Sequence, residues 1–294
     1  MTGMATLSEW IEGARPRTLP AAVSPVVIGT GSAYGLGHAD AALALLALLV
    51  ALFLQVGVNY ANDYSDGIRG TDERRVGPVR LVGQRLAQPG QVKAAAFACF
   101  GLAAVAGLAL MALSAFFWLF PIGIAAVLAA WYYTGGKHPY GYAGLGEVFV
   151  FVFFGLVAVV CTTATQVHRA DLGTWMGAVG IGSLITAVLV ANNLRDIPGD
   201  SVSGKHTLAV RLGDRGTRML YVGLVAVAGL AAVLAAVGGH PYALLGLVGL
   251  LAAVPPTRTV LSGAIGRELI PVLAGTGITC LAYGFLLAIG LALG

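Results

Sequence analysis

Two short clusters hold five of the eight aspartates in this 294-residue chain. The first cluster is Asp63, Asp66 and Asp72, and the second is Asp196 and Asp200. Each cluster directly follows a long apolar run, in a chain of which only 10% of the residues are charged. Carboxylates gathered at the ends of apolar segments repel one another and lose hydration unless cations bridge them. The pattern therefore predicts two oxygen-rich sites for Mg²⁺, which prefers carboxylate ligands.

The spacing within each cluster places its carboxylates on one face of a helix. Asp63 and Asp66 are three residues apart, and Asp196 and Asp200 are four apart, so each pair can hold one cation. Two glycines before Asp72 allow the chain to bend back, so that a third carboxylate reaches the first metal. Four asparagines extend the polar faces one turn deeper into the apolar runs: Asn59, Asn62, Asn192 and Asn193.

Basic residues alternate with these acids. They are Arg69, Arg74, Arg75, Arg80 and Arg85 in the first loop, and Arg195, Lys205 and Arg211 in the second. Acids and bases mixed around a cavity suit a Mg²⁺-bound diphosphate, because carboxylates bind the metal while Arg and Lys bind phosphate oxygens. The chain has no G-x-x-x-x-G-K-[ST] segment, which excludes a P-loop. Arginines in such loops are also topology signals, so each has this second interpretation.

The composition indicates the class of protein that positions these groups. Hydrophobic residues make up 58% of the chain and the mean hydropathy is +0.86, more apolar surface than a soluble core can hide. Unbroken apolar runs favour helices over alternating barrel strands. The sequence predicts an all-α polytopic membrane protein with about nine transmembrane helices around a central cavity. The expected spans are residues 19–36, 41–61, 91–113, 117–134, 143–163, 173–193, 217–237, 241–256 and 269–292.

The distribution of basic residues predicts the orientation in the membrane. With the N-terminus inside, 16 of the 17 Lys and Arg are cytoplasmic, the exception being Arg169. Both aspartate clusters then lie in cytoplasmic loops, and the net charge of +4 reflects topology and not nucleic-acid binding. The excess of Arg over Lys, 14 to 3, indicates a high-GC bacterial source and hence the bacterial cell (inner) membrane.

We expect one transmembrane domain, residues 1–294, because no soluble segment interrupts the spans. The two motifs recur four spans apart, which suggests half-bundles over 15–134 and 143–292. Between them lies a Tyr-rich loop holding Lys137, either an interfacial aromatic belt or a contact for a diphosphate and a carbocation. Glu147, just beyond it, is either a charge at a helix N-terminus or a polar group of the cavity.

These residues resemble the UbiA superfamily of intramembrane prenyltransferases, which has an N-D-x-x-D-type motif with a third Asp and a D-x-x-x-D motif. The position of Asp72 resembles the MenA-like branch, the 1,4-dihydroxy-2-naphthoate polyprenyltransferases. Further strings similar to that branch cover residues 14–29, 75–82, 133–155 and 192–213. The resemblance implies a helical bundle around a cavity that opens sideways to lipid.

The resemblance also implies roles for single residues. Two Mg²⁺ ions would join Asp63, Asp66, Asp72, Asp196 and Asp200 to a polyprenyl diphosphate. The diphosphate would contact Arg15, Arg69, Arg74, Arg75, Lys137, Arg195 and Lys205, while the asparagines Asn59, Asn62, Asn192 and Asn193 orient these groups. Catalysis would depend on Asp66, Asp196 and Lys137. The acceptor would be 1,4-dihydroxy-2-naphthoate, prenylated with loss of its carboxylate as CO₂ to give demethylmenaquinone in menaquinone biosynthesis.

Three alternatives remain open at this point. Another aromatic acceptor, such as 4-hydroxybenzoate, would use the same fold and metal site. CDP-alcohol phosphotransferases are also Asp-rich, but their D-x-x-D-G-x-x-A-R pattern matches only from Asp63 to Gly67. A transporter would place its carboxylates at mid-depth, whereas these lie at the ends of the spans. The expected partners are the two substrates and the bilayer, with no obligate protein partner indicated.

Overall fold

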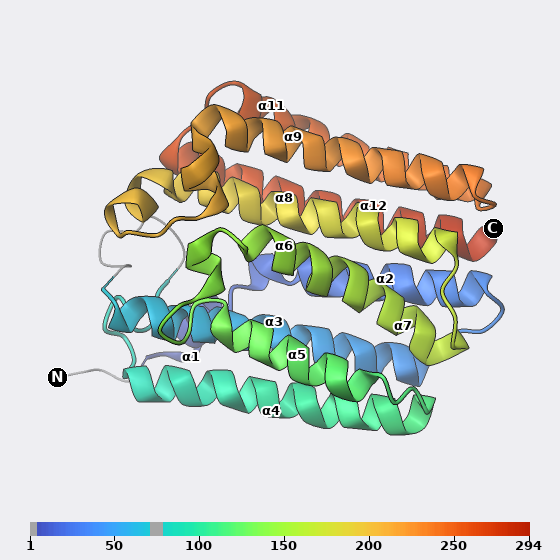
Figure 1. Ribbon diagram of the computed structural model, residues 1–294, viewed down its shortest axis with the longest axis horizontal. Helices are drawn as coiled ribbons and strands as arrows, with labels where there is room; N and C mark the ends of the chain where they lie inside the picture. Colours follow the sequence, from blue (N-terminus) through green and yellow to red (C-terminus); the bar gives the residue numbers. More distant parts are fainter. Residues whose placement is uncertain (1–4, 71–78) are drawn as a thin grey trace.

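The computed structural model describes residues 5–70 and 79–294. In these two ranges every regular element is helical, and the helices form an elongated bundle (Figure 1). The α-helices are α1 (Leu7–Gly13), α2 (Pro20–Gly35), α3 (Ala41–Ile68), α4 (Pro89–Ser114), α5 (Leu119–Tyr132), α6 (Gly146–Val150), α7 (Ala158–Val167), α8 (Leu172–Val202), α9 (Leu208–Val237), α10 (Leu245–Gly249), α11 (Val254–Leu261) and α12 (Ile270–Leu293). The short 3₁₀ segments are η1 (Pro16–Thr18), η2 (Tyr140–Ala143), η4 (Pro241–Leu244), η5 (Leu250–Ala253) and η6 (Gly266–Leu269), and η3 (Phe151–Val157) is a π-helix.

The expected count of nine spans stays a prediction. All nine expected segments are helical, but among the described residues only seven helical segments are long and apolar enough to cross a membrane. The other two are α2, with 16 residues, and α5, with 14. At 1.5 Å per residue these reach only about 24 and 21 Å, less than the roughly 30 Å hydrocarbon core. The chain is an integral membrane protein, and two of its apolar helices are short.

The helices that carry the aspartate clusters extend well beyond their apolar runs. We expected spans to end at residues 61 and 193, but α3 continues to Ile68 and α8 to Val202. The described aspartates of both clusters, Asp63, Asp66, Asp196 and Asp200, are therefore on helices. Both helices point their C-terminal ends toward the end of the bundle that holds α1 (Figure 1). The C-terminus lies at the opposite end (Figure 1). Which end faces the cytoplasm stays a prediction.

Small residues allow the central helices to pack closely. A Cβ added at Gly155, in the π-helix η3, would lie 2.6 Å from the Cα of Gly182 in α8. A Cβ added at Gly35, at the end of α2, would lie 2.1 Å from the carbonyl oxygen of Leu291 in α12. Contact between α2 and α12 joins the first and last parts of the chain, so the proposed half-bundles share this boundary. Their existence as structural units stays a prediction.

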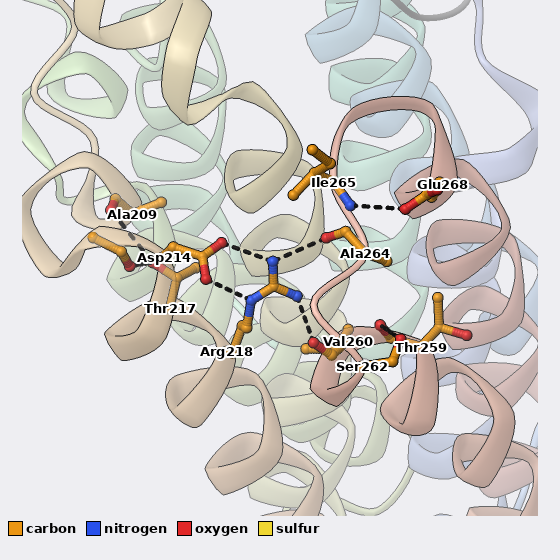
Figure 2. Close-up of polar contacts among 11 residues, drawn as sticks. Ala209, Asp214, Thr217, Arg218, Thr259, Val260, Ser262, Ala264, Ile265 and Glu268 are labelled. Carbon is orange, nitrogen blue, oxygen red and sulfur yellow. Dashed lines mark hydrogen bonds and ion pairs between the residues drawn. The ribbon is translucent and has the colours of Figure 1, made fainter.

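A buried arginine fixes the connection between α11 and α12 (Figure 2). Arg218 of α9 pairs with Asp214 one turn earlier, with Nε and Nη2 each 2.7 Å from a carboxylate oxygen. Its Nη2 also donates to the carbonyl oxygen of Ala264 at 2.9 Å, and its Nη1 donates to that of Val260. Val260 lies in the last turn of α11 and Ala264 follows that helix, so neither carbonyl has a partner within it. The guanidinium therefore stabilises a helix end, away from the cavity described next.

Candidate functional site

A cavity of about 1230 Å³ lies within the bundle, and helices α2, α3, α4, α5, α7, α8 and α12 contribute to its wall. Most of the wall is apolar, while polar groups gather at the end where α3 and α8 carry the aspartate clusters. We call this part the polar end. Its lining side chains include Arg15, Asn59, Asn62, Asp66, Arg80, Asn192, Asn193, Arg195, Asp200 and Lys205. An apolar chamber with a few convergent polar groups is typical of a ligand site.

Of the described residues of the first cluster, Asp66 lines the cavity, and it is 3% exposed. Its Oδ1 lies 3.2 Å from the Lys205 ammonium and accepts a hydrogen bond from the Tyr142 hydroxyl. The same ammonium lies 4.5 Å from the centre of the Tyr142 ring. Burial, together with the neighbouring Asp66 charge, raises the pKa of Tyr142, so its phenol stays protonated and donates. Three segments far apart in sequence meet at this oxygen.

Lys205 also joins the two aspartate clusters. Its backbone N–H donates to the carbonyl oxygen of Asp200 at 2.9 Å, while its side chain reaches Asp66. The next backbone N–H, of His206, donates to the carbonyl oxygen of Tyr142 at 2.9 Å. The Asp200 side chain is buried and lines the cavity. The expected convergence of the two acidic segments is therefore present, with a lysine between them.

Arg195 and Asp196 form a two-bond ion pair at the second motif. Arg195 Nε lies 2.7 Å from Asp196 Oδ1, and Nη2 lies 2.8 Å from Oδ2. Nη2 also donates to Asn192 Oδ1 at 2.9 Å. Arg195 lines the cavity, whereas Asp196 is buried behind it and contributes no lining atom. The two carboxylates expected on one helix face therefore have different surroundings, because Asp200 lines the cavity while Asp196 pairs with Arg195. A cation shared by both stays a prediction.

Glu147 is a polar group beside the cavity and not a solvated helix charge. It is the second residue of α6, is 5% exposed, and accepts a hydrogen bond from Asn193 Nδ2 at 2.9 Å. Asn193 lines the cavity, so Glu147 fixes the orientation of this amide from behind. Of the two interpretations that the sequence left open, the structure favours the second.

A row of polar side chains follows α3 from the aspartate into the apolar wall. The row consists of Gln55, Asn59, Asn62 and Asp66, spaced four, three and four residues apart. Asn62 Oδ1 accepts from the Thr134 hydroxyl at 2.8 Å, and Asn59 Nδ2 donates to the carbonyl oxygen of Ala14 at 2.8 Å. Gln55 was not among the predicted residues, although its helical spacing from Asn59 was a signal that it belongs to this face.

Asp63 occupies a different position from the one predicted. It has no exposed surface and does not line the cavity. Its carboxylate accepts the backbone N–H groups of Leu81 at 2.7 Å and Val82 at 3.1 Å. Side chains three residues apart on a helix point about 60° apart around its axis. Asp66 therefore reaches the cavity, while Asp63 faces the segment after the first loop. The two carboxylates expected on one helix face therefore have different surroundings, and a cation shared by both stays a prediction.

Two more arginines reach the polar end: Arg15 from the segment after α1, and Arg80 from the segment between α3 and α4. Arg15, at the end of α1, has a backbone φ of 55°, a left-handed conformation that costs energy in a non-glycine residue. Arg80 is 6% exposed and lies next to the backbone that Asp63 holds. Both side chains line the cavity. Arg80 was noted as a loop cation but not as a phosphate ligand, because nothing local in the sequence distinguishes it from the other loop arginines.

Two predicted cations lie elsewhere. Arg69 is exposed, and its guanidinium donates to the carbonyl oxygens of Thr134 and Gly136, the second at 2.5 Å. Lys137 is exposed on the adjacent turn and does not line the cavity. The geometry therefore gives no support to a catalytic or diphosphate-binding role for Lys137. Tyr142, from the same Tyr-rich loop, is the residue that reaches Asp66. Asp72, Arg74 and Arg75 lie outside the described residues.

The chemistry of the polar end fits a hard divalent cation. Asp66 and Asp200 offer carboxylate oxygens to the cavity, and Asn62 and Asn192 add amide oxygens, the donor types that Mg²⁺ prefers. Within residues 5–70 and 79–294 no group of three or more His, Cys, Asp or Glu side chains is already gathered as a metal site. The Lys205 ammonium instead lies on Asp66.

Comparison with known proteins identifies the family. The chain is 55% identical to the 1,4-dihydroxy-2-naphthoate octaprenyltransferase of Mycobacterium tuberculosis, over 99% of both chains. It is 40% identical to the Escherichia coli protein of the same name, over 74% of this chain and 72% of that one. A solved UbiA homologue from Archaeoglobus fulgidus bound to GPP and Mg²⁺ shares the fold, with a TM-score of 0.68, 15% identity, and coverage of 96% and 99%. Because residues 22–264 also match the UbiA prenyltransferase family, the chain with this polar-ended cavity belongs to that family.

Proposed function

We propose that the protein transfers a polyprenyl group from a polyprenyl diphosphate to 1,4-dihydroxy-2-naphthoate, with loss of CO₂, in menaquinone biosynthesis. The observation that carries this proposal is the polar end of the cavity, where carboxylates and cations converge at one end of an apolar chamber. An isoprenoid diphosphate has the matching shape, with an anionic head and an apolar chain. The relatives named 1,4-dihydroxy-2-naphthoate octaprenyltransferase support the choice of acceptor.

The diphosphate would bind where cations line the cavity. Lys205 and Arg195 contribute positive charge from the second motif, and Arg15 contributes it from the N-terminal side. A guanidinium can donate two parallel hydrogen bonds to phosphate oxygens, and an ammonium binds them as a point charge. Arg74 and Arg75, outside the described residues, remain further proposed ligands. Arg69 would act indirectly, because it holds the turn that precedes Tyr142.

Magnesium would be held by Asp66 and Asp200, with Asp196 acting through Arg195 and with Asp72 as a further proposed ligand. We propose two ions because the aspartates are distributed over two motifs. The Archaeoglobus fulgidus homologue bound to GPP and Mg²⁺ supports the use of this metal. When bound, Mg²⁺ supplies positive charge that stabilises the leaving diphosphate. The Lys205 ammonium, now on Asp66, would shift its contact to the phosphate oxygens.

In the proposed reaction the allylic C–O bond of the donor breaks and its electron pair leaves with the diphosphate. A carbon of the electron-rich naphthoate ring then forms the new C–C bond, and the carboxylate leaves as CO₂. Lys205 and Arg195 would stabilise the charge that develops on the diphosphate in a site with little water. Stacked aromatic rings line the wall near Tyr142, with the centroids of Tyr140 and Phe149 4.0 Å apart, and their faces can stabilise a cation.

We also propose that the polar end faces the cytoplasm of a bacterial cell, while the isoprenoid chain remains in the bilayer. The positive-inside distribution of Lys and Arg supports this orientation. Labelling of single cysteines introduced at exposed Lys137 and at Gly239, near the opposite end, tests the orientation in intact cells. Labelling of the Lys137 position by an impermeant thiol reagent from outside would contradict it.

A paired assay tests the proposed reaction. Purified protein in nanodiscs is supplied with Mg²⁺ and a prenyl diphosphate, and with 1,4-dihydroxy-2-naphthoate or 4-hydroxybenzoate in separate reactions. We expect a prenylated, decarboxylated product from the naphthoate alone, identified by mass spectrometry. Prenylation of 4-hydroxybenzoate alone would mean that the proposed acceptor is wrong. The absence of diphosphate release with either acceptor would overturn the whole proposal.

A further inference from the structure

Asp63 uses both carboxylate oxygens on the backbone of the chain. Oδ2 accepts the N–H of Leu81 at 2.7 Å, and Oδ1 accepts that of Val82 at 3.1 Å. The side chain has no exposed surface, and it lies behind the cavity wall to which Asp66 contributes. Hydrogen bonds to a carboxylate are among the stronger ones in proteins. Asp63 is therefore arranged to hold the segment that begins at Arg80.

The held segment is fixed on several sides. The backbone N–H groups of Leu86 and Ala87 both donate to the Leu81 carbonyl oxygen, at 2.8 and 3.0 Å. Val82 packs on Gly67 of α3, where an added Cβ would lie 2.4 Å from its Cγ1. Leu81 packs on Gly13 of α1, where an added Cβ would lie 2.9 Å from its Cδ1. The segment thus has one position relative to α1 and α3.

Arg80 is the residue that this arrangement places. It directly precedes the first backbone N–H held by Asp63, so the anchor is one peptide unit from its Cα. Its side chain is 6% exposed and lines the same cavity as Asp66 and Lys205. A buried guanidinium at the polar end is suited to bidentate contact with phosphate oxygens.

We propose that Asp63 is a positioning residue and not a metal ligand, and that it holds Arg80 so that Arg80 binds a phosphate oxygen of the prenyl diphosphate. This inference rests on the proposed function for the identity of the anion. It differs from the expectation drawn from the motif, in which Asp63 binds Mg²⁺ beside Asp66. It assigns the two neighbouring aspartates to separate tasks: Asp66 acts within the cavity, and Asp63 acts on the wall.

A double-mutant cycle tests the link between the two residues. In nanodiscs, Arg80→Gln should raise the KM for geranyl diphosphate by about 10- to 100-fold, the range for loss of a hydrogen bond to a charged group. Asp63→Asn should raise the same KM, because one of the two backbone N–H groups then loses its acceptor. The double variant should be no worse than Arg80→Gln alone. Additive effects, or a rise only in the KM for the naphthoate, would overturn the proposal.

Metal binding is tested separately, without turnover. Mn²⁺, used in place of Mg²⁺ and followed by electron paramagnetic resonance, should bind Asp63→Asn with the wild-type affinity and stoichiometry when pyrophosphate is present. Asp66→Asn should lose at least one bound Mn²⁺ under the same conditions. Loss of Mn²⁺ from Asp63→Asn to the same extent would make Asp63 a metal ligand and overturn the positioning role.

A direct binding measurement separates this inference from the proposed function. Calorimetry with inorganic pyrophosphate and Mg²⁺ should show about 10-fold or greater weakening in Arg80→Gln and partial recovery in Arg80→Lys. Arg85→Gln is the matched control, because it removes an exposed cation from the same segment without touching the cavity. If the wild type binds pyrophosphate but does not prenylate the naphthoate, the proposed acceptor is wrong. The Asp63/Arg80 double-mutant cycle is then measured with the pyrophosphate dissociation constants in place of KM. Wild-type affinity in Arg80→Gln would overturn the inference.

Discussion

Two Arg–Asp pairs of nearly the same geometry lie in different parts of this molecule. Arg195 and Asp196 pair at 2.7 and 2.8 Å, and Arg218 and Asp214 pair at 2.7 Å through each of two nitrogens. Both guanidinium groups are buried. Arg195 lines the cavity, while Arg218 donates its remaining hydrogen bonds to the carbonyl oxygens of Val260 and Ala264 (Figure 2).

The difference between the pairs lies in what surrounds the guanidinium. Around Arg218 the partners are the carbonyls of a helix end, and the cluster completes a structural connection. Around Arg195 the neighbours are cavity-lining groups, among them Asn192 and Asn193, and a bound anion can add to its contacts. An ion pair next to an apolar run is therefore not itself a sign of function. Position relative to the cavity separates the two pairs, and variants at each should fail in different ways.

The largest effect should follow from removing a carboxylate at the polar end. Asp66→Asn keeps the shape of the side chain but removes a charge that the proposed site uses for Mg²⁺, so turnover should fall by about 10³-fold or more. Asp200→Asn should behave similarly. Prenyl transfer measured with saturating substrates checks this expectation. Asp214→Asn, which lies outside the cavity, is the matched control and should retain most activity. Near-normal turnover in Asp66→Asn would contradict the proposal that Asp66 holds Mg²⁺ in the active site.

Loss of Lys205 should give a smaller but clear defect. Lys205→Met removes the ammonium that lies 3.2 Å from Asp66 and leaves most of the apolar stem in place. We expect kcat/KM to fall by about 10- to 100-fold, the range for one charge-assisted contact. Lys93→Met is a control, because Lys93 lies on α4 over Tyr64 and Trp131 and not at the polar end. An equal loss in both variants would mean that the effect is not local.

Arg218→Met should show the opposite pattern from Lys205→Met. The substitution leaves the carbonyl oxygens of Val260 and Ala264 without their donor, which should lower the free energy of unfolding by about 1–3 kcal/mol. Thermal melting in detergent measures this loss. At a temperature where the variant stays folded, its kcat/KM should remain close to that of the wild type. A large loss of kcat/KM without a loss of melting temperature would remove the distinction between the two pairs.

Much of the fold and part of the site followed from local patterns. Apolar runs fixed the helices, and the regular spacing of Asn59, Asn62 and Asp66 indicated a polar face on α3. The pattern does not determine which side of a helix meets the cavity, and this is why the helix spacing of Asp63 and Asp66 could not show that Asp66 lines the cavity and Asp63 does not. Asp63 meets Leu81 through contacts that span 18 residues and cross the first loop.

Contacts between distant segments limited the rest of the prediction. Tyr142 reaches Asp66 across 76 residues, and Lys205 reaches it across 139, so no local signal could pair them. Lys137 was chosen from the same loop as Tyr142, but the turn places its side chain on the exposed surface. The count of nine spans takes each apolar run to cross the membrane, and it stays a prediction because α2 and α5 are shorter than the other spanning helices.

The smallest effect concerns a hydrogen-bonded pair of Asp171 and His240, at the opposite end of the bundle from the polar end. Asp171 Oδ2 lies 2.6 Å from His240 Nε2, and Asp171 Oδ1 accepts the backbone N–H of Thr174 at 2.9 Å at the start of α8. Burial raises the pKa of the Asp171 carboxyl, but the hydrogen bonds from Thr174 and His240 outweigh it and hold the pKa below its ordinary value. A group with a depressed pKa stabilises the fold above its unfolded pKa, near 3.9, and this contribution is lost as the pH falls through the folded value.

The melting temperature of the wild type should therefore exceed that of Asp171→Asn near pH 5, and the difference should shrink below about pH 4. The difference should correspond to less than about 1 kcal/mol, because the carboxylate is partly solvated and Asn also caps a helix. Prenyl transfer at neutral pH should be unchanged. A difference in melting temperature that grows as the pH falls would show that the ionised carboxylate is destabilising. A loss of prenyl transfer in Asp171→Asn would show that this end of the bundle is coupled to the cavity. Distance from the polar end would then no longer separate structural pairs from functional ones.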